Sequence, residues 1–150
     1  MKNFIDQEIN VGDSVAFIRN QRGTPTGLMR GTVAKVNAKS INVESEGKTY
    51  RVMFTASPYK DDTKLLKAVV IKKRPPRTGE PVDFTGYPIQ EGDTIAFTEN
   101  VYQSAVESFI VGTVTSIAAQ SVGIHSDSDP KYENARRAFD RLIVINGYMD

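Results

Sequence analysis

Three arginines lie in a part of the chain that is rich in glycine and poor in apolar residues. Arg19, Arg22 and Arg30 occur in the segment IRNQRGTPTGLMRG, together with Gly23 and Gly27. Planar guanidinium groups and backbone amides both hydrogen-bond well to phosphate oxygens. The segment is therefore a candidate contact for the phosphates of a nucleic acid. The alternative interpretation is an ordinary solvated loop.

Other basic residues follow this segment in the sequence. Four of them fall on expected strands or turns, where they either extend the loop into a basic face or only increase solubility: Lys35, Lys39, Lys48 and Arg51. A second cluster flanks two prolines, and a basic segment of this kind can follow a phosphate backbone: Lys72, Lys73, Arg74 and Arg77. Tyr50 could stack on a base, although a tyrosine close to Val52 and Phe54 is more often part of a core.

No arrangement of residues typical of catalysis occurs in the sequence. There is no cysteine, no GxSxG motif for an activated serine, and no glycine-rich loop that ends in Lys-Ser or Lys-Thr. The single histidine, His125, is followed by Asp127 and Asp129, but a calcium loop requires a longer series of ligands that ends in a glutamate. We therefore expect neither an enzyme nor a bound metal or other cofactor. Asp129 is interpreted as the N-cap of a helix.

The formal net charge of +1 conceals an uneven distribution of charge. Residues 1–75 contain 14 Lys and Arg against seven Asp and Glu, which gives +7. Residues 76–150 contain five Lys and Arg against 11 Asp and Glu, which gives −6. This asymmetry indicates that the two halves contact different partners.

The chain contains an internal repeat. INVGDSVAFIRN (residues 9–20) aligns with IQEGDTIAFTEN (residues 89–100), and RGTVAKVNAKSINV (residues 30–43) aligns with VGTVTSIAAQSVGI (residues 111–124). The Gly-Asp pairs Gly12-Asp13 and Gly92-Asp93 are equivalent in the two copies. Because glycine permits unusual φ values and aspartate bonds to the nearby backbone, each pair predicts a structural turn before the first strand.

Alternation of apolar and polar residues predicts five strands in the first repeat, at residues 14–18, 31–36, 40–45, 49–54 and 68–72, with a tight turn at residues 46–48. In the second repeat, Asp129-Pro130 and YENARRAF follow the third strand directly. We therefore expect this copy to lack a hairpin and to contain a short helix over residues 130–139. The segment KKRPPRTGE is typical of a linker. The predicted organisation is a basic domain at residues 1–72, a linker at 73–83 and an acidic domain at 84–150.

The order of these elements resembles the KOW family. VGDSVAF, a polar loop and GTVAKVNAKSINVE match its succession of a Gly-Asp turn, a strand, a loop, a glycine and further strands, and EGDTIAF with GTVTSIAAQSVGI is similar to a more diverged copy. The resemblance implies a mostly β fold of two tandem SH3-like, Tudor-like small β-barrels, with the short helix in the second. KOW units of ribosomal proteins and transcription elongation factors contact RNA, DNA or protein.

These observations favour a nucleic-acid-binding protein whose basic first domain contacts phosphates with little sequence selectivity, and the resemblance implies that it modulates transcription or nucleoid organisation. Similarity in size and layout to small KOW-bearing DNA-binding proteins of phages favours duplex DNA over RNA. The acidic second domain is expected to contact a host protein, another copy of the chain or the first domain.

The main alternative is an adaptor whose two barrels both bind peptides. Its support is the second long loop, which contains Tyr102, Val106 and Phe109. A decoy whose acidic half mimics phosphate is a further alternative. No apolar stretch is long enough to cross a bilayer. The lack of cysteine, and of an apolar run in MKNFIDQEIN, favours a cytoplasmic location.

Overall fold

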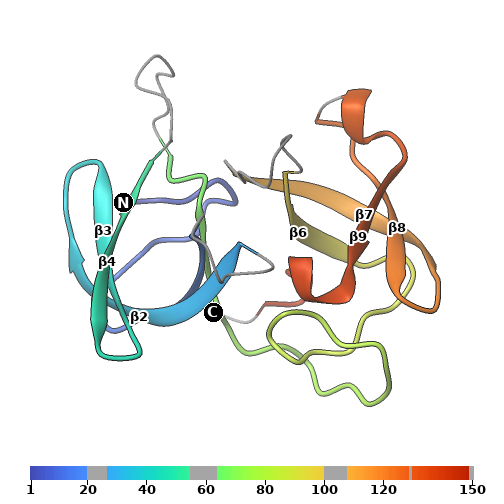
Figure 1. Cartoon of the computed structure of the whole chain (residues 1–150), viewed down its shortest axis with the longest axis horizontal. Coiled ribbons are helices and arrows are strands. Elements are labelled where there is room, and N and C mark those ends of the chain that lie inside the picture. Colours follow the sequence, from blue (N-terminus) through green and yellow to red (C-terminus); the bar gives the residue numbers. More distant parts are fainter. Residues whose placement is uncertain (20–26, 55–63, 100–107, 129, 149–150) are drawn as a thin grey trace. The chain divides into compact units, whose positions relative to one another are not determined.

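The structure is a computed structural model that describes residues 1–19, 27–54, 64–99, 108–128 and 130–148 (Figure 1). These residues form two five-stranded antiparallel sheets, with almost no helix. No helix among them is both long and apolar enough to cross a membrane. The predicted fold class, mostly β with two tandem small β domains, is confirmed except for the short helix.

The first sheet has the strand order β4-β3-β2-β1-β5. Its strands are β1 (Ser14–Ile18), β2 (Leu28–Val36), β3 (Ser40–Ser45), β4 (Lys48–Met53) and β5 (Ala68–Val70). Antiparallel hairpins join β1 to β4 in sequence, and β5 returns to pair with β1. The predicted turn between β3 and β4 is confirmed, because Glu46 and Gly47 both have positive φ (51° and 77°), as a two-residue hairpin requires.

The second sheet repeats this topology with the order β10-β6-β7-β8-β9. Its strands are β6 (Thr94–Thr98), β7 (Phe109–Ile117), β8 (Ser121–His125), β9 (Ala135–Ala138) and β10 (Leu142–Val144). An irregularity in register lies between Val33 and Lys35 in the first sheet and between Val114 and Ser116 in the second. These positions are equivalent in the sequence repeat, so the two copies share even this local distortion.

The prediction of a short helix over residues 130–139 is wrong. A 3₁₀ turn, η2 (Pro130–Tyr132), precedes β9, and a second one, η3 (Phe139–Arg141), follows it. Along β9, Ala135 and Arg137 are buried whereas the residues between and after them are exposed, which is the period of a strand. The second copy therefore keeps its fourth strand and lacks no hairpin, since pairing with β8 overrides the helix propensity of Ala, Glu and Arg.

Arg137 points into the second unit at a position that is apolar in the first. It pairs with Val122 as Val52 pairs with Ile41. Only 8% of Arg137 is exposed, and burial lowers the pKa of its guanidinium. Its Nε donates to the Thr98 carbonyl at 2.8 Å, and its Cζ lies 5.3 Å from the centre of the Phe97 ring. An arginine thus takes part in a core through backbone and aromatic contacts.

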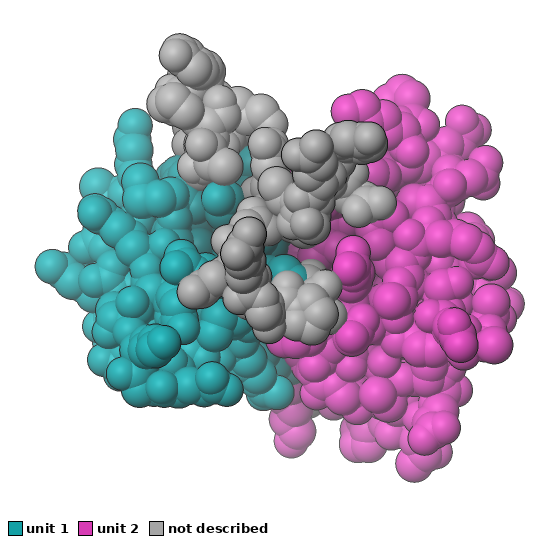
Figure 2. Space-filling model, viewed as in Figure 1, with its two compact units in different colours: residues 1–72, 100–108 teal, residues 73–99, 109–150 magenta. Residues whose placement is uncertain are grey.

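The chain divides into two compact units (Figure 2). Unit 1 contains Met1–Lys72, and unit 2 contains Lys73–Glu99 and Phe109–Asp150. The residues at 73–82, expected as part of a linker, thus belong to unit 2. Each unit has its own core, built around Phe17 in unit 1 and around Phe97 in unit 2.

The predicted role of the Gly-Asp pairs is confirmed. Gly12 and Gly92 have φ of 94° and 88°, values that favour glycine. The carboxylates that follow accept backbone bonds of 2.8 Å, Asp13 from Asn10 N and Asp93 from Gln90 N. Both pairs therefore form the turn that leads into the first strand of each unit.

A different repeated glycine is required by close packing rather than by its φ. A Cβ atom on Gly31 would lie 2.5 Å from the Glu44 carbonyl oxygen and 2.6 Å from Val43 Cγ1. On the equivalent Gly112 it would lie 2.9 Å from the His125 carbonyl oxygen. The second strand of each sheet therefore approaches the third too closely for any side chain at this position.

We predict that Gly31→Ala lowers the free energy of unfolding by about 1–3 kcal/mol, because the backbone of β3 must move to admit the methyl group. Urea unfolding followed by circular dichroism measures the change. The exposed neighbour Thr32 provides the control, since Thr32→Ala is expected to change stability by less than about 0.5 kcal/mol. Equal unfolding midpoints for the two variants would contradict the close approach.

Candidate nucleic-acid interface

A row of polar side chains crosses three strands of unit 1. Lys35 on β2 is paired with Asn42 on β3, which is paired with Arg51 on β4. Residues directly opposite one another in a sheet project from the same face. The alternate residues Ile41, Val43 and Val52 are buried in the core, so Lys35, Asn42 and Arg51 lie on the outer face of the sheet.

Hydrogen bonds at the turn between β2 and β3 hold two side chains of this row in place. The Asn37 side-chain amide donates to Ser40 Oγ at 3.1 Å and to Asn42 Oδ1 at 3.3 Å. Arg51 Nε donates to Ser40 Oγ at 3.3 Å, which uses one of the five N–H donors of the guanidinium. Lys39 is exposed on the same turn. We refer to Lys35, Lys39, Asn42 and Arg51 together as the hairpin face.

Two other predicted residues of unit 1 are exposed but lie away from the hairpin face. Arg30 is opposite Ala16 on β1, and the row that contains Glu44 lies between it and Lys35. Lys48 begins β4 and pairs with Ser45, next to the exposed carboxylate of Glu46. The structure therefore brings together three of the predicted basic residues, Lys35, Lys39 and Arg51, and places Arg30 and Lys48 elsewhere on unit 1.

Arg19 and Tyr50 contact each other. The Arg19 Cζ atom lies 5.0 Å from the centre of the Tyr50 ring, within cation–π distance. The Tyr50 ring in turn lies 5.8 Å from that of Phe17. Tyr50 thus packs on the core of unit 1, the alternative that the sequence favoured over base stacking. Arg22 lies outside the described residues.

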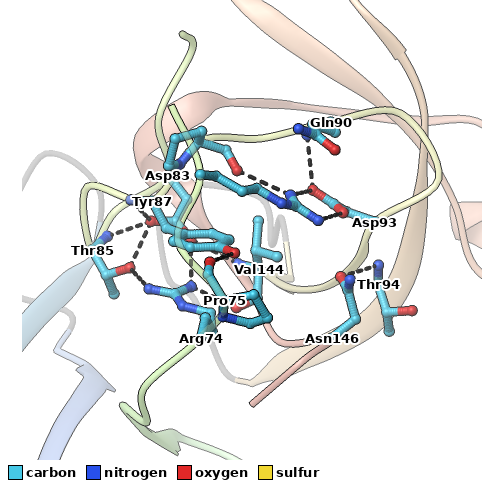
Figure 3. A network of polar contacts seen from close by, with 12 residues as sticks. Arg74, Pro75, Asp83, Thr85, Tyr87, Gln90, Asp93, Thr94, Val144 and Asn146 are labelled. Carbon is cyan, nitrogen blue, oxygen red and sulfur yellow. Dashed lines mark hydrogen bonds and ion pairs between the residues drawn. The ribbon is translucent and has the colours of Figure 1, made fainter. Parts of the chain in front are cut away.

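The predicted basic cluster near the two prolines is divided by the structure. Lys72 is half-buried and Lys73 is exposed. Arg74, in contrast, is buried in unit 2, where it forms an ion pair of 3.1 Å with Asp83 (Figure 3). Only 7% of the Arg74 side chain and none of the Asp83 side chain is exposed. Because its guanidinium binds protein groups, we leave Arg74 out of the candidate interface.

His125 joins two parts of unit 2. Its Nδ1 lies 2.9 Å from the Glu133 carbonyl oxygen and its Nε2 lies 2.8 Å from Asp127 Oδ1. Both partners accept hydrogen bonds, so the doubly protonated ring fits best, and these bonds raise the pKa of His125 above its ordinary value of 6.5. Asp129 lies outside the described residues. The described parts of the chain hold no group of three His, Cys, Asp or Glu side chains placed to share a metal ion.

The polar residues that organise the hairpin face were not predicted. Asn37, Ser40 and Asn42 are uncharged and common on surfaces, and their spacing indicates a turn rather than a site. The signal that connects them is the register of β3 with β2 and β4, which the sequence alone does not provide.

The chain belongs to a family described as a domain of unknown function (DUF7205), which matches residues 1–71 and 81–145. The first matched segment lies in unit 1, and the second covers most of unit 2. No curated protein matches the chain. The function is therefore argued from the residues themselves.

We predict that the pKa of His125 in the folded protein is above 6.5 and that Asp127→Asn lowers it, because the variant loses the carboxylate beside Nε2. Since the folded-state pKa is the raised one, the contacts stabilise the fold below about pH 6.5 and are lost as the pH rises through the folded pKa. His125 is the only histidine, so an NMR titration reports it without overlap. A pKa at or below 6.5 in the wild type would contradict the two contacts.

Proposed function

We propose that this member of the DUF7205 family binds nucleic acid through the hairpin face of unit 1, by contacts to backbone phosphates with little sequence selectivity. The observation that supports the proposal is the cross-strand row of Lys35, Asn42 and Arg51 on an exposed sheet surface. Lysine, arginine and asparagine side chains all bind phosphate oxygens, and such contacts position a protein without reading bases.

The spacing of the row suits an extended polyanion. Lys35 and Arg51 are two strands apart, or about 10 Å at the usual distance between neighbouring strands. Both side chains are long, so they can reach different phosphates of one backbone. The hydrogen bond that Arg51 Nε donates to Ser40 Oγ orients the guanidinium in advance, which reduces the entropy lost when it binds.

The distribution of charge supports a role for unit 1 in binding a polyanion. Residues 1–72 contain 12 Lys and Arg against seven Asp and Glu, whereas residues 73–150 contain seven against 11. In unit 2 the row equivalent to Lys35, Asn42 and Arg51 consists of Ser116, Gly123 and Arg136. The second copy thus retains one of the two cations, on a unit whose net charge repels a polyanion.

Duplex DNA is the preferred ligand in this proposal, since the chain resembles small KOW-bearing DNA-binding proteins of phages. A cytoplasmic role in transcription or in nucleoid organisation follows from such binding. Arg30, Lys48 and Lys72 of unit 1 are secondary contacts apart from the hairpin face, and Lys73 of unit 2 is a further one. The acidic unit 2 is left to bind a protein partner.

We predict that Lys35→Ala with Arg51→Ala weakens binding to duplex DNA to a similar degree for unrelated sequences. The slope of log K against log salt, expected near −4 to −5 for the wild type, becomes shallower by about two because two phosphate contacts are lost. Fluorescence anisotropy of labelled duplexes at several salt concentrations measures both effects, and labelled single strands and RNA test the preference for duplex DNA.

The matched control removes two exposed cations from unit 2, with Lys131→Ala and Arg136→Ala. Arg136 is the counterpart of Arg51, and the loss of net charge is the same. The control variant is expected to bind DNA within about twofold of the wild type. An equal loss of DNA affinity in the two variants would show that only the net charge of the protein matters. Wild-type binding that does not change with salt would favour the peptide-binding adaptor.

A further inference from the structure

The segment Arg74-Pro75-Pro76-Arg77 contacts the rest of unit 2 mainly through its two arginines (Figure 3). We refer to it as the RPPR segment. Arg74 Nη1 donates to the Val144 carbonyl oxygen at 2.7 Å as well as to Asp83, and its Nη2 donates to Thr85 Oγ1 at 2.6 Å. The first arginine therefore binds a carboxylate, a carbonyl and a hydroxyl at once.

The second arginine is held by a different carboxylate. Arg77 Nη1 and Nη2 lie 2.7 and 2.8 Å from the two oxygens of Asp93, which is the bidentate geometry that only arginine provides. Arg77 Nη1 also donates to the Pro88 carbonyl at 3.2 Å. Burial alone would raise the pKa of Asp93, but the bonds from Arg77 and from the Gln90 backbone outweigh it and lower this pKa.

Aromatic rings and a glycine complete the surface around the segment. The Arg74 Cζ atom lies 4.1 Å from the centre of the Tyr87 ring and 5.2 Å from that of Tyr148, and the Tyr87 ring also lies 5.1 Å from Arg77. The Tyr87 hydroxyl donates to the Pro75 carbonyl. A Cβ atom on Gly147 would lie 3.2 Å from Pro75 Cδ, so this glycine leaves room for the proline.

In unit 1, uncharged side chains of the unit itself hydrogen-bond to the backbone of the closing strand. The equivalent of Asp83 is Asn3, and the equivalent of Val144 is Val70 on the closing strand. The side chain of Gln7 accepts from Val70 N and donates to Val70 O, both at 2.9 Å. In unit 2 a carboxylate accepts from Val144 N, and the cation that balances it and binds Val144 O comes from the RPPR segment.

We propose that Asp83, Tyr87, Asp93 and Tyr148 form a recognition site for arginine-flanked diproline peptides, which the RPPR segment of the same chain occupies. The fixed φ of proline keeps such a peptide extended and spaces its two arginines, so little entropy is lost on binding. The same groups bind an RPPR peptide from another chain once the internal segment has been displaced. A covalently attached ligand has an effective concentration in the millimolar range, so the external peptide competes poorly with it in the wild type.

The test uses the full chain with Arg74→Ala and Arg77→Ala, which removes the internal ligand, and a synthetic peptide of residues 71–79, IKKRPPRTG. We expect this peptide to bind the variant more tightly than the wild type by on the order of tenfold or more. Isothermal titration calorimetry gives both affinities. Equal affinity for the two proteins, or no binding to the folded variant, would overturn the proposal.

Two controls define the chemistry of the site. A peptide with lysine in place of both arginines keeps the charge but loses the planar fork, and is expected to bind the variant at least about tenfold more weakly. Adding Asp93→Asn to the variant is expected to weaken the RPPR peptide by a similar factor, because the bidentate pair is lost. An affinity independent of both changes would reduce the binding to non-specific attraction by an acidic unit and overturn the proposal.

The variant leaves the buried carboxylate of Asp83 without its cation, so it is expected to be less stable than the wild type. If the variant does not fold alone, the experiment measures its folding upon addition of the peptide. The dispersion of the NMR signals of unit 2 monitors this folding. The RPPR peptide then restores the fold at concentrations at which the lysine peptide does not, because only the bound state is stabilised. Failure of the RPPR peptide to restore the fold would also overturn the proposal.

Discussion

Both units depend on hydrogen bonds that satisfy the backbone of the closing strand of each sheet. β5 and β10 are each three residues long and pair with one neighbour, β1 or β6. A buried backbone N–H or C=O must nevertheless have a hydrogen-bond partner. Polar side chains that precede the Gly-Asp turn of each unit provide it, from Asn3 and Gln7 in unit 1 and from Asp83 in unit 2. These bonds attach the beginning of each unit to its last strand.

The chemical difference between Asn3 and Asp83 explains why unit 2 binds the arginines of the RPPR segment, whereas unit 1 uses uncharged side chains. An amide can both donate and accept, so Asn3 and Gln7 satisfy each other and the strand without a charge. A buried carboxylate requires a cation, and loss of one partner from such a pair typically costs about 3–5 kcal/mol. Arg74 provides this cation, and Arg77 adds the pair with Asp93. The residues around the two prolines are therefore part of the fold of unit 2.

Much of the fold could be predicted from the sequence because apolar residues alternate along strands that are buried on one side. The bounds of β1 and β3 agree with the prediction, and the repeat places their counterparts β6 and β8. β9 was missed because Ala135 and Arg137 favour helices and the latter does not look like a core residue. The docking of Arg74 was missed because Asp83 is nine residues away in sequence, and only the folded chain brings the two side chains together.

The candidate interface depends on a distortion that sequence patterns do not reveal. Thr32 is opposite Glu44 and Val33 is opposite Val43, so a regular ladder would place Ala34 opposite Asn42. The irregularity between Val33 and Lys35 instead pairs Lys35 with Asn42 and moves its side chain from the core face to the outer face, in line with Arg51. Unit 2 has the same bulge, but there it brings Ser116 opposite Gly123. One distortion of the backbone thus lines up two cations in one copy and leaves a single cation, Arg136, in the equivalent row of the other. The side chains that a shared scaffold presents, rather than the scaffold itself, therefore distinguish the two units.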